Sequence, residues 1–276
     1  MHAALLLLPF LTSVLPAPKR AKPVVISKQK YGDIVQFQQL MKRGMYKSSR
    51  TEIKRTKWNH KDGKGNIIIP YIITAEDYDA EETSNITKAM KRIEDRTCIR
   101  FAKRRNQKYY VEIRNVKDKG CYAYVGRNKR GFISVLQLES SEENTCMSIP
   151  SILHELLHIV GLWHEQNRYD RDMYIQVNYE NIGRLYYAQF KKLPHVDSNI
   201  YNVSYDYLSI MHYDKGAFPR KGGKGLITME TLDPKYQDLI GHATDATEND
   251  YLKVCEIYAC KRCKLSKRIR MTTFIL

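Results

Sequence analysis

The segment that most restricts how this chain can fold is HELLHIVGLWHEQ, which runs from His154 to Gln166. It places histidines among apolar residues at a regular spacing. Residues four apart on a helix lie one turn apart on the same face, so His154 and His158 can direct both imidazoles at one point. Gly161 can take the left-handed conformation that ends a helix, which allows the chain to turn back and bring His164 to the same point.

Two interpretations of this segment compete. The first is a buried amphipathic helix whose histidines are hydrogen-bonded within the core, and the second is a set of ligands around a metal ion. The pattern HExxH alone is weak evidence, but Gly161 and His164 satisfy further independent constraints and favour the metal. Three nitrogen ligands leave one position on zinc open for water, and Glu155 lies where it can take a proton from that water. The sequence therefore predicts one zinc ion per subunit, with Glu155 as the base.

The rest of the pattern indicates an α+β fold. At 276 residues the chain is long enough for a sizeable core. Ile86, Met90 and Ile93 recur at helical spacing in the stretch 85–96, and Pro150 opens a second helix with Ser148 as its candidate cap. A run rich in β-branched residues predicts a strand at residues 67–74, and alternating runs predict strands at residues 109–113 and 132–136. Beyond the histidine helix the sequence is irregular, so we expect an α+β upper half and a loop-rich lower half.

The net charge of +16 invites a nucleic-acid interpretation, but its distribution argues against one. Residues 19–57 hold 12 Lys/Arg and 2 Asp/Glu, and residues 261–270 hold 6 Lys/Arg, so residues 58–260 are neutral overall. Proteins that bind polyanions usually carry the charge on one face of the folded domain. We therefore expect no nucleic-acid partner.

The first seventeen residues are typical of a secretory signal peptide. They contain no charged side chain, and their apolar block from Ala3 to Leu15 is too short to cross a bilayer. The alternative is a short buried helix, because the segment also lacks the usual Lys or Arg before the apolar block. Six cysteines and two glycosylation sequons, at Asn85 and Asn202, agree with an extracellular location. We expect a secreted protein without a transmembrane anchor.

A family resemblance follows from the extended motif. HELLHIVGLWHEQNRYDRD, with SIMHY at residues 209–213, matches the metzincin signature of three histidines and a downstream Met-turn. With a glutamate directly after the third histidine, the sequence resembles the astacin family of secreted zinc endopeptidases. Other segments match in order: Trp58 before IIIPY, RTCIRF from Arg96, GCYAYVG from Gly120, and the closing stretch from Asp250 to Cys260. The resemblance covers about residues 51–260.

The resemblance implies a two-lobed metzincin-type protease. Its upper lobe would be a twisted mixed sheet with two helices, its lower lobe would be loop-rich, and zinc would lie in the cleft between them. His154, His158 and His164 would bind the zinc ion, and Glu155 would be the catalytic base. The expected substrates are extracellular proteins or peptides, and the sequence does not select one.

The Met-turn segment would supply two more site residues. Met211 would form an apolar floor beneath the histidines. Tyr213 would approach the metal at rest and then swing to hydrogen-bond the oxyanion that develops during hydrolysis. The alternative is that Tyr213 is one more buried tyrosine in a tyrosine-rich chain. His212 would be a neighbour of the metal site and not a ligand.

The resemblance also implies a zymogen that a trypsin-like protease activates by cutting the basic leader after Arg50 or Arg55. Glu165 would then bind the new N-terminus, unless it is a simple surface glutamate. In the leader, Asp33 would occupy the open zinc position before the cut, since carboxylate oxygens bind zinc well. Lys30 stands where relatives have phenylalanine, which leaves an ordinary turn aspartate as the alternative for Asp33.

These assignments divide the chain into four parts. They are a signal peptide (1–17), a propeptide (18–50), an astacin-like catalytic domain (51–260) and a basic C-terminal tail (261–276). The disulfides that the resemblance implies are Cys98–Cys260 and Cys121–Cys146. Cys255 and Cys263 are extra relative to the family, and whether they pair with each other stays open. The tail is either a solvated disordered segment or a surface for heparin or membranes.

Three functions remain to be compared. The leading hypothesis is a secreted zinc endopeptidase made as a zymogen. A catalytically silent relative that acts as a binding protein is the first alternative, although every ligand and the base are present in the sequence. A matrix or polyanion binder that works through the two basic ends is the second.

Overall fold

The computed structural model describes residues 33–34, 57–74, 77–128, 131–142, 145–193, 201–261 and 263. The predicted signal peptide, most of the propeptide, both candidate activation sites and most of the basic tail lie outside these residues. No helix in the described part of the chain is both long and apolar enough to cross a membrane.

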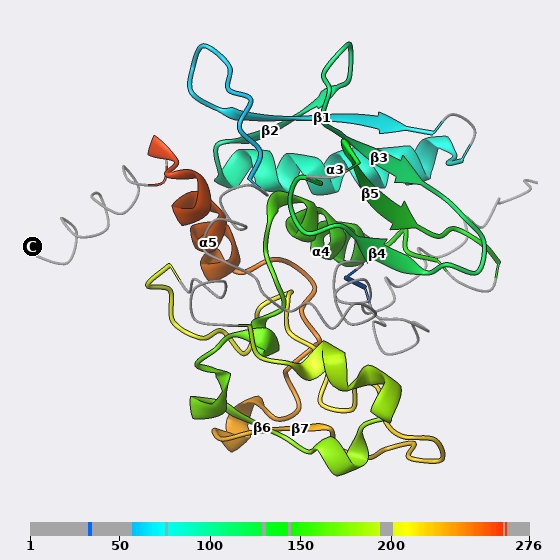
Figure 1. The fold of residues 1–276 in the computed structure, drawn as a ribbon, viewed down its shortest axis with the longest axis vertical. Coiled ribbons are helices and arrows are strands. Elements are labelled where there is room, and N and C mark those ends of the chain that lie inside the picture. Colours follow the sequence, from blue (N-terminus) through cyan, green and yellow to red (C-terminus); the bar gives the residue numbers. More distant parts are fainter. Residues whose placement is uncertain are drawn as a thin grey trace, which may run out of the picture.

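The upper half of the molecule is built on a five-stranded mixed sheet (Figure 1). Its strands are β1 (Ile67–Ile73), β2 (Ile99–Lys103), β3 (Tyr110–Arg114), β4 (Cys121–Ala123) and β5 (Ile133–Leu138), in the spatial order β2-β1-β3-β5-β4. Strands β1, β2, β3 and β5 are parallel, and β4 pairs with β5 in the antiparallel direction. The short β4 is therefore an edge strand, with one side of its backbone available for another segment.

Two helices pack against this sheet. Helix α3 (Ala80–Arg96) begins earlier than its apolar spacing predicted, because Asp79 and Glu82 form a capping box at its start. It contacts β2 and α4, while α4 (Ile149–Val160) contacts β4 and β5. Ser148 caps α4, and Pro150 lies in its first turn, as the sequence predicted. Every residue of α4 from Pro150 to Val160 is buried.

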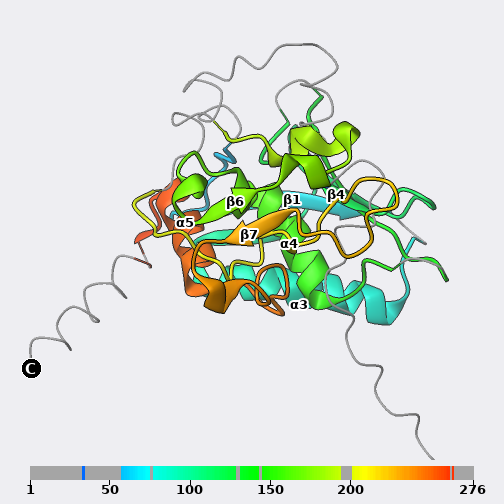
Figure 2. The ribbon, with the colours of Figure 1, turned by 90° about the horizontal axis from the view of Figure 1, so that it is seen from below.

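The lower half consists mainly of loops and short 3-10 helices. These are η2 (Glu165–Asn167), η3 (Arg171–Met173), η4 (Tyr179–Asn181), η5 (Arg184–Phe190) and η6 (Pro234–Tyr236), with a two-stranded sheet of β6 (Ile175–Val177) and β7 (Met229–Thr231). Phe190, Tyr213 and Phe218 are central members of its separate apolar core. Figure 2 looks onto this half, with β6 and β7 in front of α4. The predicted two-lobed α+β fold is confirmed.

Helix α5 (Glu248–Tyr258) lies at one edge of the molecule in both views (Figures 1 and 2). The disulfide Cys98–Cys260 joins the end of α5 to the start of β2 across a sequence separation of 162 residues. Closing a loop of that length stabilises the fold by about 5 kcal/mol in the chain-entropy model. The second expected disulfide, Cys121–Cys146, is also present, and Cys255 pairs with Cys263.

Candidate metal centre

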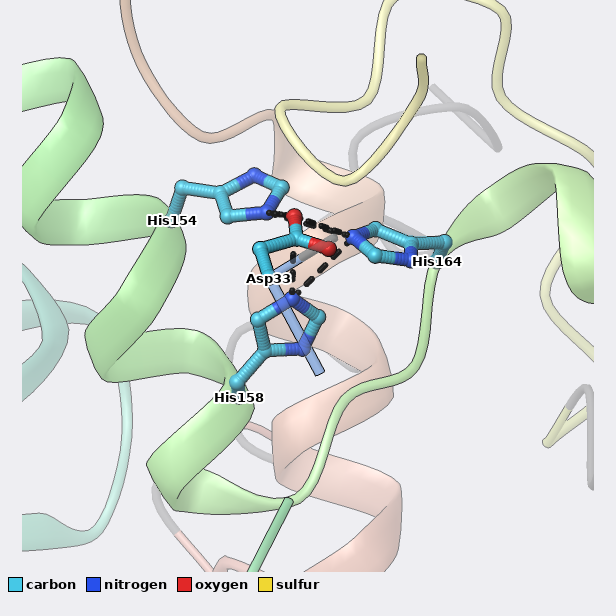
Figure 3. Close-up of side chains that lie close together, drawn as sticks. All are labelled: Asp33, His154, His158 and His164. Atoms are coloured by element: carbon cyan, nitrogen blue, oxygen red, sulfur yellow. Dashed lines mark hydrogen bonds and ion pairs between the residues drawn. The ribbon is translucent and has the colours of Figure 1, made fainter. Parts of the chain in front are cut away.

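The turn after α4 brings the third histidine back to the first two. Gly161 ends the helix with φ of 124°, and its N–H donates to the carbonyls of Leu157 and His158. A residue with a Cβ rarely adopts this backbone conformation, so the glycine is required here. The chain then reverses, and His164 faces His154 and His158 from the opposite side (Figure 3).

The three Nε2 atoms converge on one point. The Nε2 of His164 lies 3.1 Å from that of His158 and 3.3 Å from that of His154. The Nδ1 atoms of His154 and His158 each lie 2.7 Å from a backbone carbonyl, that of Ile210 and that of Leu162. A carbonyl only accepts, so both Nδ1 atoms carry the proton and both Nε2 lone pairs face the centre. Converging lone pairs at this distance are the donor set that zinc takes.

Asp33 of the leader lies on the same centre. Its Oδ2 is 2.8 Å from the Nε2 of His164 and 3.1 Å from that of His154, while the Nε2 of His158 is 3.9 Å away (Figure 3). One ligand atom from each of these four residues fits within a span of 4.8 Å. Asp33 is held there by the backbone of β4, because the Ala123 N–H donates to its carbonyl at 2.9 Å and Ile34 forms a bridge with Ala123.

Burial and charge set the protonation of these groups. Burial lowers the pKa of His158 to about 3 and also lowers the pKa of His164, so both rings favour the neutral form that binds metals. Burial alone would raise the pKa of Asp33. The positive charge that His164 carries when it is protonated, and the hydrogen bonds that the three histidines donate in their protonated forms, outweigh burial and hold the pKa of Asp33 well below its usual range. Asp33 is therefore a carboxylate with a strong electrostatic preference for this position.

Glu155 lies beside the histidines but is not one of the four converging groups. It is buried, and its Oε2 has no hydrogen-bond partner in the described part of the chain. Burial, followed by the negative charge of Asp33, raises the pKa of Glu155 well above its ordinary value. A buried carboxylate oxygen without a partner is costly unless it serves a reaction or a bound species. The position suits a base that acts next to a bound metal.

The Met-turn, residues 209–213, contacts the histidine helix, because the Ile210 carbonyl lies 2.7 Å from Nδ1 of His154. Met211 is buried in the upper core, and its carbonyl accepts the Glu165 N–H at 2.9 Å. Asp250 of α5 holds the turn, since its carboxylate accepts from the Ser209 hydroxyl at 2.6 Å and from the Ile210 N–H at 3.1 Å. Sequence reasoning assigned no role to Asp250, although its place in the capping box of α5 was a usable signal.

Tyr213 and His212 point in different directions. The Tyr213 hydroxyl is buried and donates to Oδ1 of Asp33 at 3.0 Å, with Oε1 of Gln189 at 3.5 Å. Its ring centroid lies 4.4 Å from that of His164. His212 faces away, with its Nδ1 2.8 Å from the Tyr213 carbonyl and its Nε2 2.7 Å from the Tyr205 hydroxyl. The structure thus places Tyr213, and not His212, at the metal centre.

Glu165 is only 3% exposed, so the interpretation as a surface glutamate is wrong. Its Oε1 accepts from Nη1 of Arg168 and from the Asp206 N–H, each at 3.0 Å. Its Oε2 forms an ion pair with Lys253 of α5. No sequence pattern pointed to this last contact, because the two residues are far apart in the chain.

The two sequons differ in their surroundings. Asn85 lies within α3, half-buried, and its Nδ2 donates to the Met147 carbonyl at 3.4 Å. Asn202 is exposed in a turn, with φ of 56°. Asn202 therefore offers its amide to solvent more freely than Asn85 does.

The family model that describes the astacin peptidases matches residues 51–259. The chain is 44% identical to the zinc metalloproteinase nas-5 of Caenorhabditis elegans over 80% of this chain and 60% of the relative, and 38% identical to nas-6 of the same nematode over 75% and 56%. It therefore spans less than two thirds of the length of these two relatives. High choriolytic enzyme 1 of Oryzias latipes is 37% identical, over 73% of this chain and 69% of the relative.

A solved structure agrees with the sequence matches. The hatching-enzyme zinc protease high choriolytic enzyme 1 of medaka superimposes with a TM-score of 0.66 at 33% identity, covering 79% of this chain and 99% of that chain. The match therefore includes the sheet, the histidine helix and the loop-rich half together. With the family model covering most of the chain and the converging histidines in place, this protein belongs to the astacin family.

Proposed function

We propose that this protein is a zinc-dependent endopeptidase, made as a secreted zymogen, which hydrolyses peptide bonds in extracellular proteins or peptides. The observation that carries the proposal is the convergence of three histidine Nε2 atoms beside the buried, unpartnered carboxylate oxygen of Glu155. The intact set of ligands and base disfavours a silent relative. The names of the relatives, zinc metalloproteinase and choriolytic enzyme, agree with the proposed activity.

Each residue of the site has its own role in the proposed hydrolysis. His154, His158 and His164 would hold one zinc ion, which when bound supplies a Lewis acid that makes water acidic at neutral pH and polarises a carbonyl. Glu155 takes the proton from the attacking water on its free Oε2 and passes it to the leaving amine. Tyr213 donates its hydroxyl to the oxygen of the scissile carbonyl as negative charge develops there. Met211 packs beneath the histidines and keeps the floor of the site apolar.

Secretion and processing complete the proposal. A signal peptide at residues 1–17 would direct export, and three disulfides in the described part of the chain agree with an oxidising compartment. A trypsin-like protease would remove the propeptide, residues 18–50, by a cut after Arg50, which leaves the catalytic domain of residues 51–260 beginning at Thr51, or by a cut after Arg55, which makes Thr56 its first residue. Glu165 is the proposed contact for the new N-terminus. Asn202 is the better placed of the two glycosylation sites.

The direct test is a peptide-cleavage assay on the full chain before and after treatment with trypsin. We expect a fluorogenic peptide to be cleaved only after activation, once trypsin has been blocked by its protein inhibitor. A zinc chelator should abolish the signal because the histidines alone supply no nucleophile, and one equivalent of zinc should restore it. Cleavage that survives chelation, or none at all after a verified cut, contradicts the proposal.

A second prediction concerns Asp33. In a chain made uncleavable by Arg50→Gln and Arg55→Gln, Asp33→Ala should raise the chelator-sensitive activity. A hydrogen bond to a charged group contributes about 1.5–3 kcal/mol. Losing the bond between Asp33 and the histidines should therefore raise the fraction of molecules with an uncovered site roughly 10–100-fold. The measurement is the initial rate on a short peptide. Asp238→Asn, at an exposed carboxylate, is the control that should stay silent. If Asp33→Ala also leaves the initial rate unchanged, then other residues of the leader block the site.

A further inference from the structure

The carboxylate of Glu165 is satisfied from within the chain. Its Oε1 has two donors, Nη1 of Arg168 and the Asp206 N–H, and its Oε2 is paired with the ammonium of Lys253. The side chains of Glu165 and Lys253 are 3% and 9% exposed, so solvent screens their attraction little. A buried carboxylate with this number of donors has its hydrogen-bonding capacity largely met.

Two cations face Glu165, Lys253 and Arg168. The guanidinium of Arg168 is shared, since its Nε and Nη2 bind the two oxygens of Asp170 at 2.9 and 2.8 Å while its Nη1 pairs with Glu165 at 3.0 Å. Its remaining Nη1 also reaches the carbonyls of Val203 and Ser204. The charge of Arg168 is therefore divided between Asp170 and Glu165. The ammonium of Lys253 supplies the second positive charge that balances Glu165.

Helix α5 contacts two segments of the metal centre, the Met-turn and the segment that follows His164. Lys253 and Asp250 are three residues apart on α5, so they project from one face. Asp250 fixes the Met-turn, as described above, while Lys253 binds the residue that follows His164. Burial raises the pKa of Asp250, and the positive charge of Lys253 opposes the shift, which agrees with one compact charge cluster. Glu165 completes the connection, because its N–H donates to the Met211 carbonyl.

We propose that Lys253 is a positioning residue that holds Glu165, and through it the segment of His164, in its working place before the activating cut. These contacts are all present while Asp33 still lies on the histidines. The cut would then switch the enzyme on by releasing Asp33. The ammonium of the freed N-terminus can join or replace Lys253 at Glu165, but assembly of the site does not depend on it. This inference rests on the proposed protease function.

The first test replaces the ammonium. Lys253→Met keeps the length of the side chain and removes its charge, and partners of this kind typically change activity or metal affinity by about 10–100-fold. We expect the activated variant to lose kcat to that extent with little change in KM, and to release zinc to a chelator faster. Lys253→Arg should recover most of the loss. Lys235→Met, at an exposed lysine paired with Asp233, is the matched control.

A double variant distinguishes an effect of Lys253 through Glu165 from a general loss of stability. If Lys253 acts through Glu165, then Lys253→Met with Glu165→Gln should be no worse than the poorer single variant, because the two changes remove one interaction. All assays should run well below the lowest melting temperature of the set. A Lys253→Met enzyme with a lower melting temperature and an unchanged kcat overturns the proposal.

The second test leaves Lys253 untouched and varies the N-terminus of the mature enzyme. An engineered cut site would produce chains that begin at Thr51, at Thr56, or with three extra residues before Thr51. We expect kcat/KM to agree within about threefold across the series, a spread below 1 kcal/mol. If kcat/KM falls sharply for every N-terminus but one, then the freed ammonium, and not Lys253, assembles the site. No activity in any form would instead contradict the protease function itself.

Discussion

Glu155→Gln is expected to abolish peptide cleavage while the protein keeps its zinc. Glutamine has nearly the shape of glutamate but cannot take a proton from water, and general base catalysis contributes roughly 10²–10⁴ in rate. The metal should stay because the three histidine Nε2 atoms do not involve Glu155. The measurements are kcat on a fluorogenic peptide after activation and the zinc content of the same sample.

The control for this variant is Glu180→Gln, at an exposed glutamate of η4, which should leave both quantities unchanged. The zinc content decides the interpretation. If Glu155→Gln loses the metal, then Glu155 supports the ligands and is not the base. If it keeps both the metal and the wild-type kcat, the proton passes through a different group. Each of these results contradicts the role proposed here.

Tyr213→Phe should lower kcat by about 10²–10³ with little change in KM, the typical cost of removing one donor to a developing oxyanion. The variant removes only the hydroxyl that now donates to Oδ1 of Asp33. The ring stays packed against His164, Phe190 and Phe218, so the fold should be unaffected. Steady-state kinetics on the activated enzyme is the measurement.

The same variant has a second expected effect, on the zymogen. Without the hydroxyl, Asp33 loses one of its hydrogen bonds and should leave the histidines more readily. Tyr207→Phe, which removes a hydroxyl bound to the Tyr174 carbonyl at 2.8 Å, is the matched control and should leave kcat unchanged. A Tyr213→Phe enzyme with wild-type kcat would mean that Tyr213 is only a core tyrosine.

The histidine helix shows how far sequence reasoning reaches. The spacing of His154 and His158, with Gly161 as the break, determines local geometry that any helix of this sequence must adopt, and the structure agrees. Strand β1 was predicted from its β-branched run, and β3 and β5 from side-chain alternation, which are local signals of the same kind. The order of the strands in the sheet depends on contacts between segments far apart in the chain, which local patterns do not specify.

The same distinction between local patterns and contacts of distant segments applies to the residues of the site. That Asp33 reaches the histidines followed only from the family resemblance, since its nearest histidine in the site, His154, is 121 residues away in sequence. The pairing of Cys255 with Cys263 stayed open because the family offers no parallel. The ion pair between Glu165 and Lys253 was missed entirely. Neither partner is unusual in sequence, and only the docking of α5 beneath the Met-turn brings them together.

The position of α5 in the chain has a consequence for biosynthesis. A ribosome makes Asp33 first, the histidines later, and Asp250, Lys253 and Cys260 near the end. The ligands therefore cannot be locked in place until the closing helix has emerged and Cys260 has found Cys98. By that time Asp33, the proposed inhibitor, has long been synthesised and can dock on β4. If it has that role, the catalytic centre would be covered by the leader from the moment it forms.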